Sequence, residues 1–273
     1  MKVLGFSGKA QSGKNTCCNF VAGLELTNSG VIDYFRISDL GQLVAPYDDK
    51  ENQLDLQRQD TNFVKYLEEK IYPIVKIYSF ADALKSLLMN LFEVDYDDLY
   101  ALIGDKNKAT TVKWANIHKT LSETSLPKAE HPSEFLTVRE LLQVVGTNLF
   151  RNISDSVWTE ACLNKVLADQ SNFALVCDVR FPNEADSIHL IGGKVIRLTR
   201  NPENNPHDSE TALDTYKKFD YVLDNKNLNI EEQCDSLYKK LKEWGWINYE
   251  TKLVENNESD ESDKVETGNS VKN

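Results

Sequence analysis

The stretch "GKAQSGKNT", residues 8 to 16, follows the apolar run "KVLGF" and has the spacing of a phosphate-binding loop. Gly8 is followed, after four residues, by Gly13 and Lys14. Glycines let the backbone turn tightly, so that N–H groups point inward at a phosphate chain, and the lysine can reach the β- and γ-phosphates. A chance match is expected in roughly 1% or fewer of chains this long. The stretch therefore predicts nucleotide-phosphate binding, with Lys14 as the main ligand.

The hydroxyl of this loop comes one residue later than in the general motif. Asn15 occupies the position that usually holds Ser or Thr, and Thr16 follows it. GTPases and many ATPases place the hydroxyl directly after the lysine, as a Mg²⁺ ligand. Small-molecule kinases similar to adenylate kinase instead have the order Gly-Lys-x-Thr. The sequence "GKNT" has this second order, which favours a nucleotide-type kinase over a motor or a switch.

Strand-like and helix-like segments alternate along the chain. The loop lies between a predicted strand at 3–7 and a predicted helix that begins at Thr16. Further strands are predicted at 74–80, 173–181, 194–200 and 221–225, and further helices at 84–92, 137–151, 155–169, 182–191 and 230–246. Thr137 and Glu140 have the spacing of a capping box. The alternation predicts an α/β fold with a mainly parallel sheet covered by helices on both faces.

Two polar stretches and an acidic tail mark the organisation of the chain. We predict one domain over residues 1–250, with polar insertions near 41–70 and 104–135, and we place no site in the first insertion. Helical spacing returns there only near "FVKYLEEK". Residues 251–273 are acidic, carry almost no apolar side chain, and are predicted to be disordered.

Composition excludes several classes of function. The chain has 41% apolar and 27% charged residues and a net charge of −12, which argues against a broad basic surface for a nucleic acid polymer. Its five cysteines have no CxxC spacing and are interpreted as reduced thiols. Neither a secretory leader nor a long apolar run is recognisable, so we expect a cytoplasmic protein that does not bind membranes.

Charged residues near strand ends are candidates for a phosphoryl-transfer site. Asp178 ends an apolar strand, where ligands bind in open α/β sheets, and it can orient Mg²⁺ through water. Five arginines could supply cations to a transferring phosphoryl group, although most arginines are simply solvated or paired at the surface. They are Arg139, Arg151, Arg180, Arg197 and Arg200. Lys85 is either a substrate contact or part of a helix start, and Trp158 is either a core residue or a stacking platform.

Two other kinds of chemistry are not supported by the sequence. The loop at 205–213 holds His207, Asp208 and Glu210 but lacks a third spaced ligand, so we reject a zinc site. Ser209 and Thr211 have no GxSxG context, so we also reject a hydrolase nucleophile there.

Taken together, six segments resemble the bacteriophage deoxynucleoside monophosphate kinases of the P-loop nucleotide-kinase group. These are "FSGKAQSGKNT", "YSFADALKSLL", "TVRELLQVVGTNLFR" with "VW", "CDVRFPNEAD", "GGKVIRLTRNP" and "HDSETAL". The likeness runs in order from about residue 2 to 247. It implies a P-loop NTPase-like three-layer sandwich and transfer of the ATP γ-phosphate to a deoxynucleoside monophosphate (dNMP), with Mg²⁺ as cofactor, for DNA precursor synthesis.

The resemblance also implies roles for individual residues. On the ATP side, the resemblance implies that the phosphates are bound by Gly8, Gly13, Lys14, Asn15 and Thr16. It also implies that Arg200 covers the adenine and that Thr16 and Asp178 bind the metal. On the acceptor side, the resemblance implies that a set of eight residues binds the monophosphate substrate: Lys85, Arg139, Gly146, Thr147, Trp158, Asp178, Arg180 and Glu184. Its catalytic residues are Lys14, Arg139, Asp178 and Arg180. Ala10 and Gln11 depart from the family, whose best-known member has a Lys-Arg pair here.

The implied reaction requires little covalent chemistry from the protein. The acceptor is already an anionic phosphate oxygen, so positioning and charge neutralisation suffice. A lid must exclude water, and the stretches 41–70 and 104–135 are its candidates. Two alternatives stay open: a kinase of another small acceptor, similar to dephospho-coenzyme A kinase, and a non-catalytic nucleotide-dependent switch. The base preference and a homodimer are left open as well.

Overall fold

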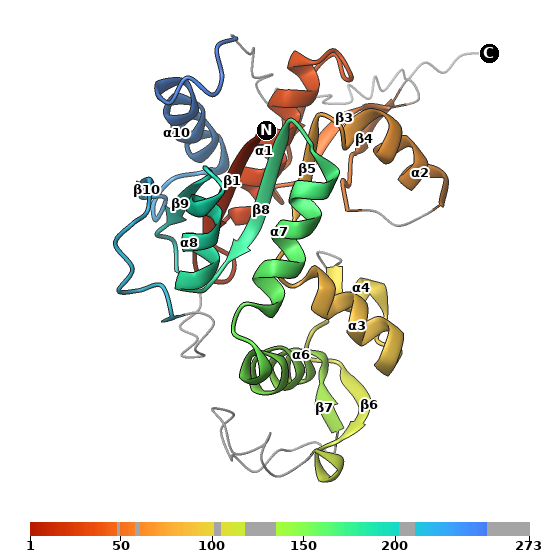
Figure 1. Ribbon diagram of the computed structural model, residues 1–273. Coiled ribbons are helices and arrows are strands. Elements are labelled where there is room, and N and C mark those ends of the chain that lie inside the picture. Colours follow the sequence, from red (N-terminus) through yellow and green to blue (C-terminus); the bar gives the residue numbers. More distant parts are fainter. Residues whose placement is uncertain (48–49, 58–60, 101–104, 118–134, 202–210, 250–273) are drawn as a thin grey trace, which may run out of the picture.

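The computed structural model describes residues 1–47, 50–57, 61–100, 105–117, 135–201 and 211–249. A five-stranded parallel sheet lies at its centre (Figure 1). Its order is β10 (Tyr221–Leu223), β9 (Lys194–Leu198), β1 (Lys2–Ser7), β8 (Phe173–Val179) and β5 (Val75–Tyr78). The predicted α/β fold with a parallel sheet is confirmed. The central β1 leads into the phosphate-binding loop, at the point where the strand order reverses and ligands bind.

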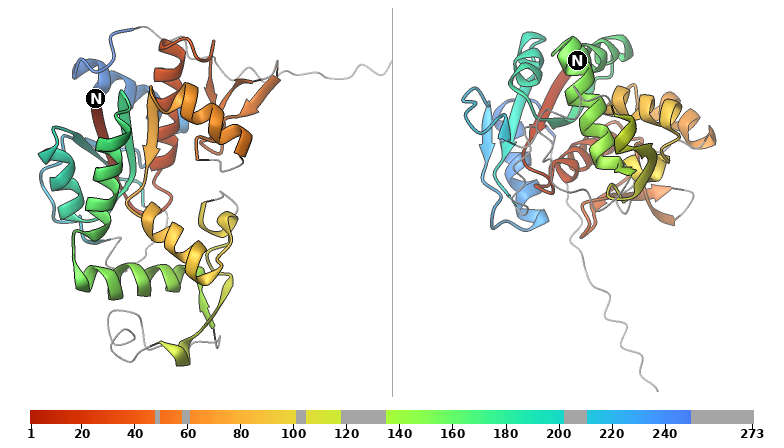
Figure 2. Two further views of the ribbon diagram at one scale, coloured as in Figure 1. Left: turned by 45° about the vertical axis from the view of Figure 1, so that its right-hand side comes forward. Right: turned by 90° about the horizontal axis from the view of Figure 1, so that it is seen from below.

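Helices cover both faces of this sheet, as predicted. One face packs against α1 (Lys14–Asn28) and α10 (Ile230–Glu243), and the other against α7 (Val157–Asp169) and α8 (Pro182–Leu190) (Figures 1 and 2). Along β1, Leu4 and Phe6 belong to the first core and Val3 to the second, because successive side chains of a strand point to opposite faces. The result is a three-layer sandwich.

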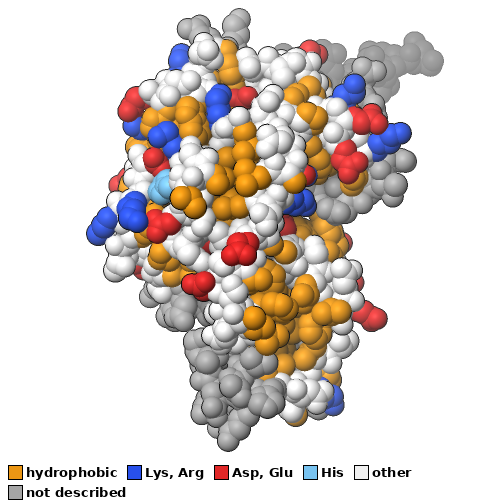
Figure 3. Space-filling model, in the orientation of Figure 1, with side chains coloured by type: hydrophobic (Ala, Val, Ile, Leu, Met, Phe, Trp, Pro, Cys, Tyr) orange, Lys and Arg blue, Asp and Glu red, His pale blue; other side chains and the backbone are white. Residues whose placement is uncertain are grey.

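A smaller lobe carries a third hydrophobic core. It comprises α3 (Asp82–Phe92), α4 (Tyr96–Tyr100), β6 (Ala109–Lys113), the 3₁₀ turn η2 (Trp114–Asn116), β7 (Phe135–Thr137), α6 (Val138–Gln143) and the π-helical η3 (Val144–Arg151). The predicted capping box is confirmed, since the Glu140 amide donates to Thr137 Oγ1 at 3.2 Å and the Thr137 amide donates to Glu140 Oε2 at 2.7 Å. Apolar side chains gather over this lobe in Figure 3.

The first polar stretch contains regular structure that the sequence did not predict. In it, β3 (Leu43–Tyr47) and β4 (Lys50–Gln53) form an antiparallel sheet with β2 (Arg36–Ile37), which comes just before the stretch, and α2 (Thr61–Tyr66) and the π-helical η1 (Leu67–Ile71) follow. Leu43, Leu54 and Leu56 are buried in the core beneath α1. These few apolar positions, spread among charged residues, gave too weak a pattern to predict strands from periodicity.

The second polar stretch is partly ordered. We predicted only a polar insertion here, and within it β6 pairs antiparallel with β7, with Ala109 opposite Thr137. Residues 118–134 and the acidic tail lie outside the described residues. All five cysteines are buried and free.

Candidate active site

The phosphate-binding loop joins β1 to α1, which begins at Lys14, two residues earlier than predicted. Gly13 has φ +96, in the left-handed region where a side chain is strained, and a Cβ on Gly13 would lie 2.8 Å from Gln233 Oε1. Lys14 is 8% exposed, and its Nζ donates to the carbonyl oxygens of Gly8 at 2.8 Å and Lys9 at 2.6 Å. The loop therefore holds the lysine ammonium against its own backbone, where the sequence predicts that a phosphate chain binds.

The first turn of α1 lies against the turn between β2 and β3. Asn15 is exposed and Thr16 is half-buried. A Cβ on Gly41, which has φ +74, would lie 2.2 Å from Thr16 Oγ1, and the Asn19 amide donates to the Gly41 carbonyl at 2.9 Å. Gly41 is the first residue of the stretch 41–70, in which the sequence predicted no site. The structure places it directly beside the Thr16 hydroxyl.

Two buried amides support the back of the loop. Asn225 Nδ2 donates to the Ser12 carbonyl at 2.8 Å and to Gln233 Oε1 at 2.6 Å, and Gln233 Nε2 donates to the Gly13 carbonyl at 3.3 Å. Asn225 Oδ1 also accepts from the amides of Thr199 and Arg200. Asn225 and Gln233 are 0% and 1% exposed. Together they join the loop to the end of β9 and to α10.

If the loop binds ATP, as the sequence predicts, Gln233→Met should raise the KM for ATP more than the KM for the phosphate acceptor. The variant loses the donor to the Gly13 carbonyl and leaves the buried Asn225 amide short of an acceptor, which costs about 1–3 kcal/mol. Steady-state kinetics with each substrate varied, together with thermal unfolding, measure the effect. Equal changes in both KM values would contradict a role specific to this loop.

Arg200 lies at the end of β9 beside these amides. Its guanidinium donates to the carbonyl oxygens of Asn225 at 3.1 Å and Leu228 at 2.5 Å. The side chain therefore spans the turn between β10 and α10, next to the loop, which is compatible with the predicted contact to the adenine.

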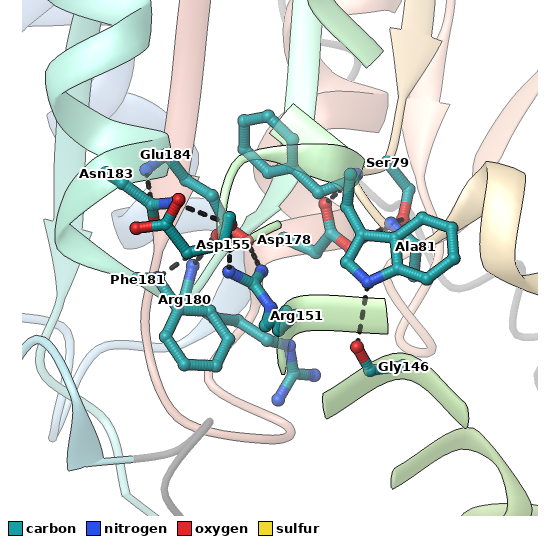
Figure 4. A network of polar contacts seen from close by, with 12 residues as sticks. Ser79, Ala81, Gly146, Arg151, Asp155, Asp178, Arg180, Phe181, Asn183 and Glu184 are labelled. Atoms are coloured by element: carbon teal, nitrogen blue, oxygen red, sulfur yellow. Dashed lines mark hydrogen bonds and ion pairs between the residues drawn. The ribbon is translucent and has the colours of Figure 1, made fainter. Parts of the chain in front are cut away.

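Asp178, near the end of β8, holds the turn between β5 and α3 (Figure 4). One carboxylate oxygen accepts from the Phe80 amide at 2.7 Å, and the other accepts from Ser79 Oγ at 2.5 Å and from the Ala81 amide at 3.2 Å. The aspartate thus fixes the start of α3, which carries Lys85.

Glu184 is 1% exposed and is paired with Arg151. Its second oxygen accepts from the amides of Arg180 at 2.7 Å and Phe181 at 3.1 Å, and the Arg151 guanidinium lies 3.8 Å from the centroid of the Phe181 ring. Burial raises the pKa of Glu184 to about 7, against the opposing effect of Arg151. In Figure 4 Glu184 lies beside Arg151 and the backbone of Arg180, so it positions these arginines.

This raised pKa predicts a pH dependence of stability. Because the folded state binds the Glu184 proton more tightly than the unfolded state, stability falls as the pH rises from about 4.5 to about 7. At 1.36 kcal/mol per pKa unit, the loss is about 3 kcal/mol and is complete above pH 7. Urea unfolding of wild type and Glu184→Gln across this range measures it. We expect the difference in unfolding free energy to vary with pH, and a constant difference would contradict the assignment.

Gly146, Thr147 and Trp158 lie in the smaller lobe and at its junction with α7. The Trp158 indole N–H donates to the Gly146 carbonyl at 2.9 Å, and the side chain is 6% exposed within the third core. A Cβ on Gly146 would lie 2.6 Å from Leu84 Cδ2. Thr147 is half-buried. The packing of Trp158 matches the core alternative that the sequence left open.

Cys177 on β8 is buried next to Asp178 in the chain. Burial raises the pKa of the Cys177 thiol to about 12, and Asp178 adds to this effect, while Lys85 and Lys14 oppose it. Because β1, β8 and β5 are parallel neighbours, the loop after β1, Asp178 near the end of β8 and residues 79–81 after β5 lie at the same edge of the sheet.

A family model described as "Deoxynucleotide monophosphate kinase" matches residues 2–241. The chain belongs to this family. The chain is also 28% identical over 186 residues, 63% of its length, to a protein of Acanthamoeba polyphaga mimivirus named "Putative deoxynucleotide monophosphate kinase", and the match covers 84% of that protein. This kinase therefore uses a nucleotide phosphoryl donor and acts on small nucleotides. Among the described residues, none of the helices is both long enough and apolar enough to span a membrane.

Several residues of this kinase site were not predicted from the sequence. Ser79 lies in the segment "YSFADALKSLL", but nothing in that segment singled it out, and Gly41 has no distinctive pattern around it. Asn225 ends a predicted strand and Gln233 interrupts the apolar face of the last helix, which are usable signals. Arg197 donates to Ser7 Oγ and Asp214, so it joins β9 to β1. His207, Asp208, Ser209 and Glu210 lie outside the described residues.

Proposed function

We propose that this kinase transfers the γ-phosphate of ATP to a deoxynucleoside monophosphate, with Mg²⁺, to give the diphosphate. The observation that carries the proposal is that the loop of Lys14 and the turn held by Asp178 follow the carboxyl ends of neighbouring parallel strands. β1 leads into the loop, and the Asp178 carboxylate near the end of β8 accepts hydrogen bonds from residues 79–81, which precede the helix that carries Lys85. Donor and acceptor phosphates bound on the two sides would meet there, as an in-line transfer requires.

On the donor side, the loop backbone, Lys14 and Thr16 would hold the ATP phosphates, and Arg200 would lie against the adenine. Thr16 and Asp178 offer oxygen atoms, the ligands that Mg²⁺ prefers. Because both Asp178 oxygens already accept hydrogen bonds from residues 79–81, we assign this aspartate to the waters of the ion. Bound Mg²⁺ would neutralise charge that develops on the transferring phosphoryl group.

On the acceptor side, Lys85, Arg139 and Arg180 would bind the monophosphate. Glu184 would act through Arg151 and the Arg180 backbone, which it holds in place. The acceptor oxygen is already anionic, so the protein needs no general base and contributes orientation and positive charge.

The family match favours this acceptor over a dephospho-coenzyme A-like substrate or a non-catalytic switch. A coupled assay of full-length protein with ATP, Mg²⁺ and a panel of dNMPs, NMPs and dephospho-coenzyme A tests the proposal. We expect turnover with at least one dNMP and none with dephospho-coenzyme A. Activity on the non-nucleotide acceptor alone, or nucleotide binding without acceptor-dependent turnover, would overturn it. The molar mass in solution decides whether the enzyme is a homodimer, which the sequence left open.

A further inference from the structure

The first turn of α3 carries an acid and a base, Asp82 and Lys85, which lie three residues apart. Opposite charges at this spacing are neighbours on a helix surface and commonly pair. In the part of the chain that the structure describes, however, the Lys85 ammonium forms neither an ion pair nor a hydrogen bond. The contacts of these two side chains explain why they stay apart.

Tyr100, the last residue of α4, contacts both the acid and the base. Lys85 Nζ lies 4.0 Å from the centroid of the Tyr100 ring, and the Tyr100 hydroxyl donates to Asp82 Oδ1 at 3.3 Å. Burial, and then Asp82, raise the pKa of this hydroxyl, so it stays protonated and donates. Asp82 Oδ2 accepts from the Ser79 amide at 2.9 Å. Both carboxylate oxygens are therefore engaged, and the ammonium lies on the ring face instead.

This arrangement lies at the edge of the sheet where Asp178 holds the start of α3 (Figure 4). Ser79, whose amide binds Asp82, donates its hydroxyl to Asp178 at 2.5 Å, and the Ala81 amide donates to the same oxygen at 3.2 Å. Lys85 is half-buried, one turn further along the helix. An ammonium has three N–H donors, and an aromatic face uses none of them. Lys85 can therefore donate to an anion that binds at this edge.

We propose that Tyr100 is a positioning residue for the acceptor phosphate, because it keeps Lys85 from pairing with Asp82. The inference rests on the proposed function and adds to it a residue of α4 that does not itself touch the phosphate. An ammonium paired with a carboxylate would have to give up that pair before it could bind a phosphate. An ammonium on an aromatic face keeps its donors for the ligand, which lowers the cost of binding.

Tyr96, in the first turn of α4, provides a matched control. Its ring stacks on that of Tyr100, with centroids 4.7 Å apart and an interplanar angle of 17°. Its hydroxyl donates to the Gln57 carbonyl rather than to Asp82. Tyr96→Phe therefore removes a hydroxyl from the same aromatic pair and leaves the charges of α3 as they are.

Calorimetric titrations with dAMP, dCMP, dGMP and dTMP test the inference in wild type, Tyr100→Phe and Tyr96→Phe. Phenylalanine keeps the ring face but leaves one oxygen of Asp82 able to pair with Lys85. We expect Tyr100→Phe to weaken the binding of the dNMP about 3- to 10-fold, which corresponds to one hydrogen bond. The affinity for ATP should stay the same, and Tyr96→Phe should bind dNMP like the wild type.

The double variant Tyr100→Phe, Asp82→Asn separates positioning from a structural role. Asparagine keeps an acceptor for the Ser79 amide but carries no charge to pair with Lys85, so we expect the affinity for dNMP to recover. An unchanged affinity in Tyr100→Phe, an equal loss in Tyr96→Phe, or no recovery in the double variant overturns the inference.

The same titrations distinguish this inference from the proposed function. If the wild type binds a dNMP but does not phosphorylate it, the proposed function fails, and the binding data still decide the role of Tyr100. If no dNMP binds to the wild type, both are overturned.

Discussion

Lys14→Met is expected to abolish phosphoryl transfer while the protein stays folded. The ammonium is held by the Gly8 and Lys9 carbonyls inside the loop, so under the proposed function it would already lie close to the phosphates that it neutralises. Removing one preorganised charge donor of this kind lowers turnover by about 10²–10³-fold or more. Methionine keeps most of the buried side-chain volume, so the unfolding temperature should change little. The coupled ATP assay and thermal unfolding measure the two effects.

Lys9→Met is the matched control, because it makes the same substitution in the same loop. Lys9 forms an ion pair with Asp214 at 2.9 Å, and pairs at the surface contribute at most about 1 kcal/mol. We expect this variant to keep most of its activity. Equal losses in both variants would show that the loop responds to any change of charge, and near-normal activity of Lys14→Met would contradict the assigned role.

The two ends of the site differ in how far the sequence predicts them. The loop is predictable because a short motif between a strand and a helix fixes backbone and ligands together, and Gly13 and Lys14 lie where that motif requires. The substrate side depends on contacts between distant segments. Asp178 reaches residues 79–81 only through the fold, because about a hundred residues separate them in the chain.

The buried side-chain amides behind the loop are harder to predict than the loop itself and easier to predict than the substrate side. Asn225 and Gln233 lie more than 200 residues from Ser12 and Gly13, so no local pattern predicts the contact. A fully buried glutamine on an otherwise apolar helix face is nevertheless a signal, since such a group needs a buried partner. Periodicity alone treated it as an ordinary interruption of that face.

Glu184→Leu is expected to destabilise the protein by about 3–5 kcal/mol at pH 8. The substitution leaves the Arg151 guanidinium, which is 13% exposed, without its carboxylate. It also removes the acceptor of the Arg180 and Phe181 amides at the start of α8. Urea unfolding measures the loss. A change below about 1 kcal/mol would mean that the site takes up water or another anion in place of the carboxylate.

The double variant Arg151→Met, Glu184→Leu separates the cost of an unpaired charge from the cost of lost packing. Burial raises the pKa of Glu184 even with Arg151 beside it, so desolvation of the carboxylate outweighs the attraction within the pair. An apolar pair avoids that desolvation, and we expect the double variant to be about 1–3 kcal/mol more stable than Glu184→Leu alone. It should still transfer phosphate poorly, because the amide of Arg180 has lost the acceptor that positions it. Recovery of stability without recovery of kcat/KM for the dNMP would assign the buried pair to positioning the site rather than to stabilising the fold.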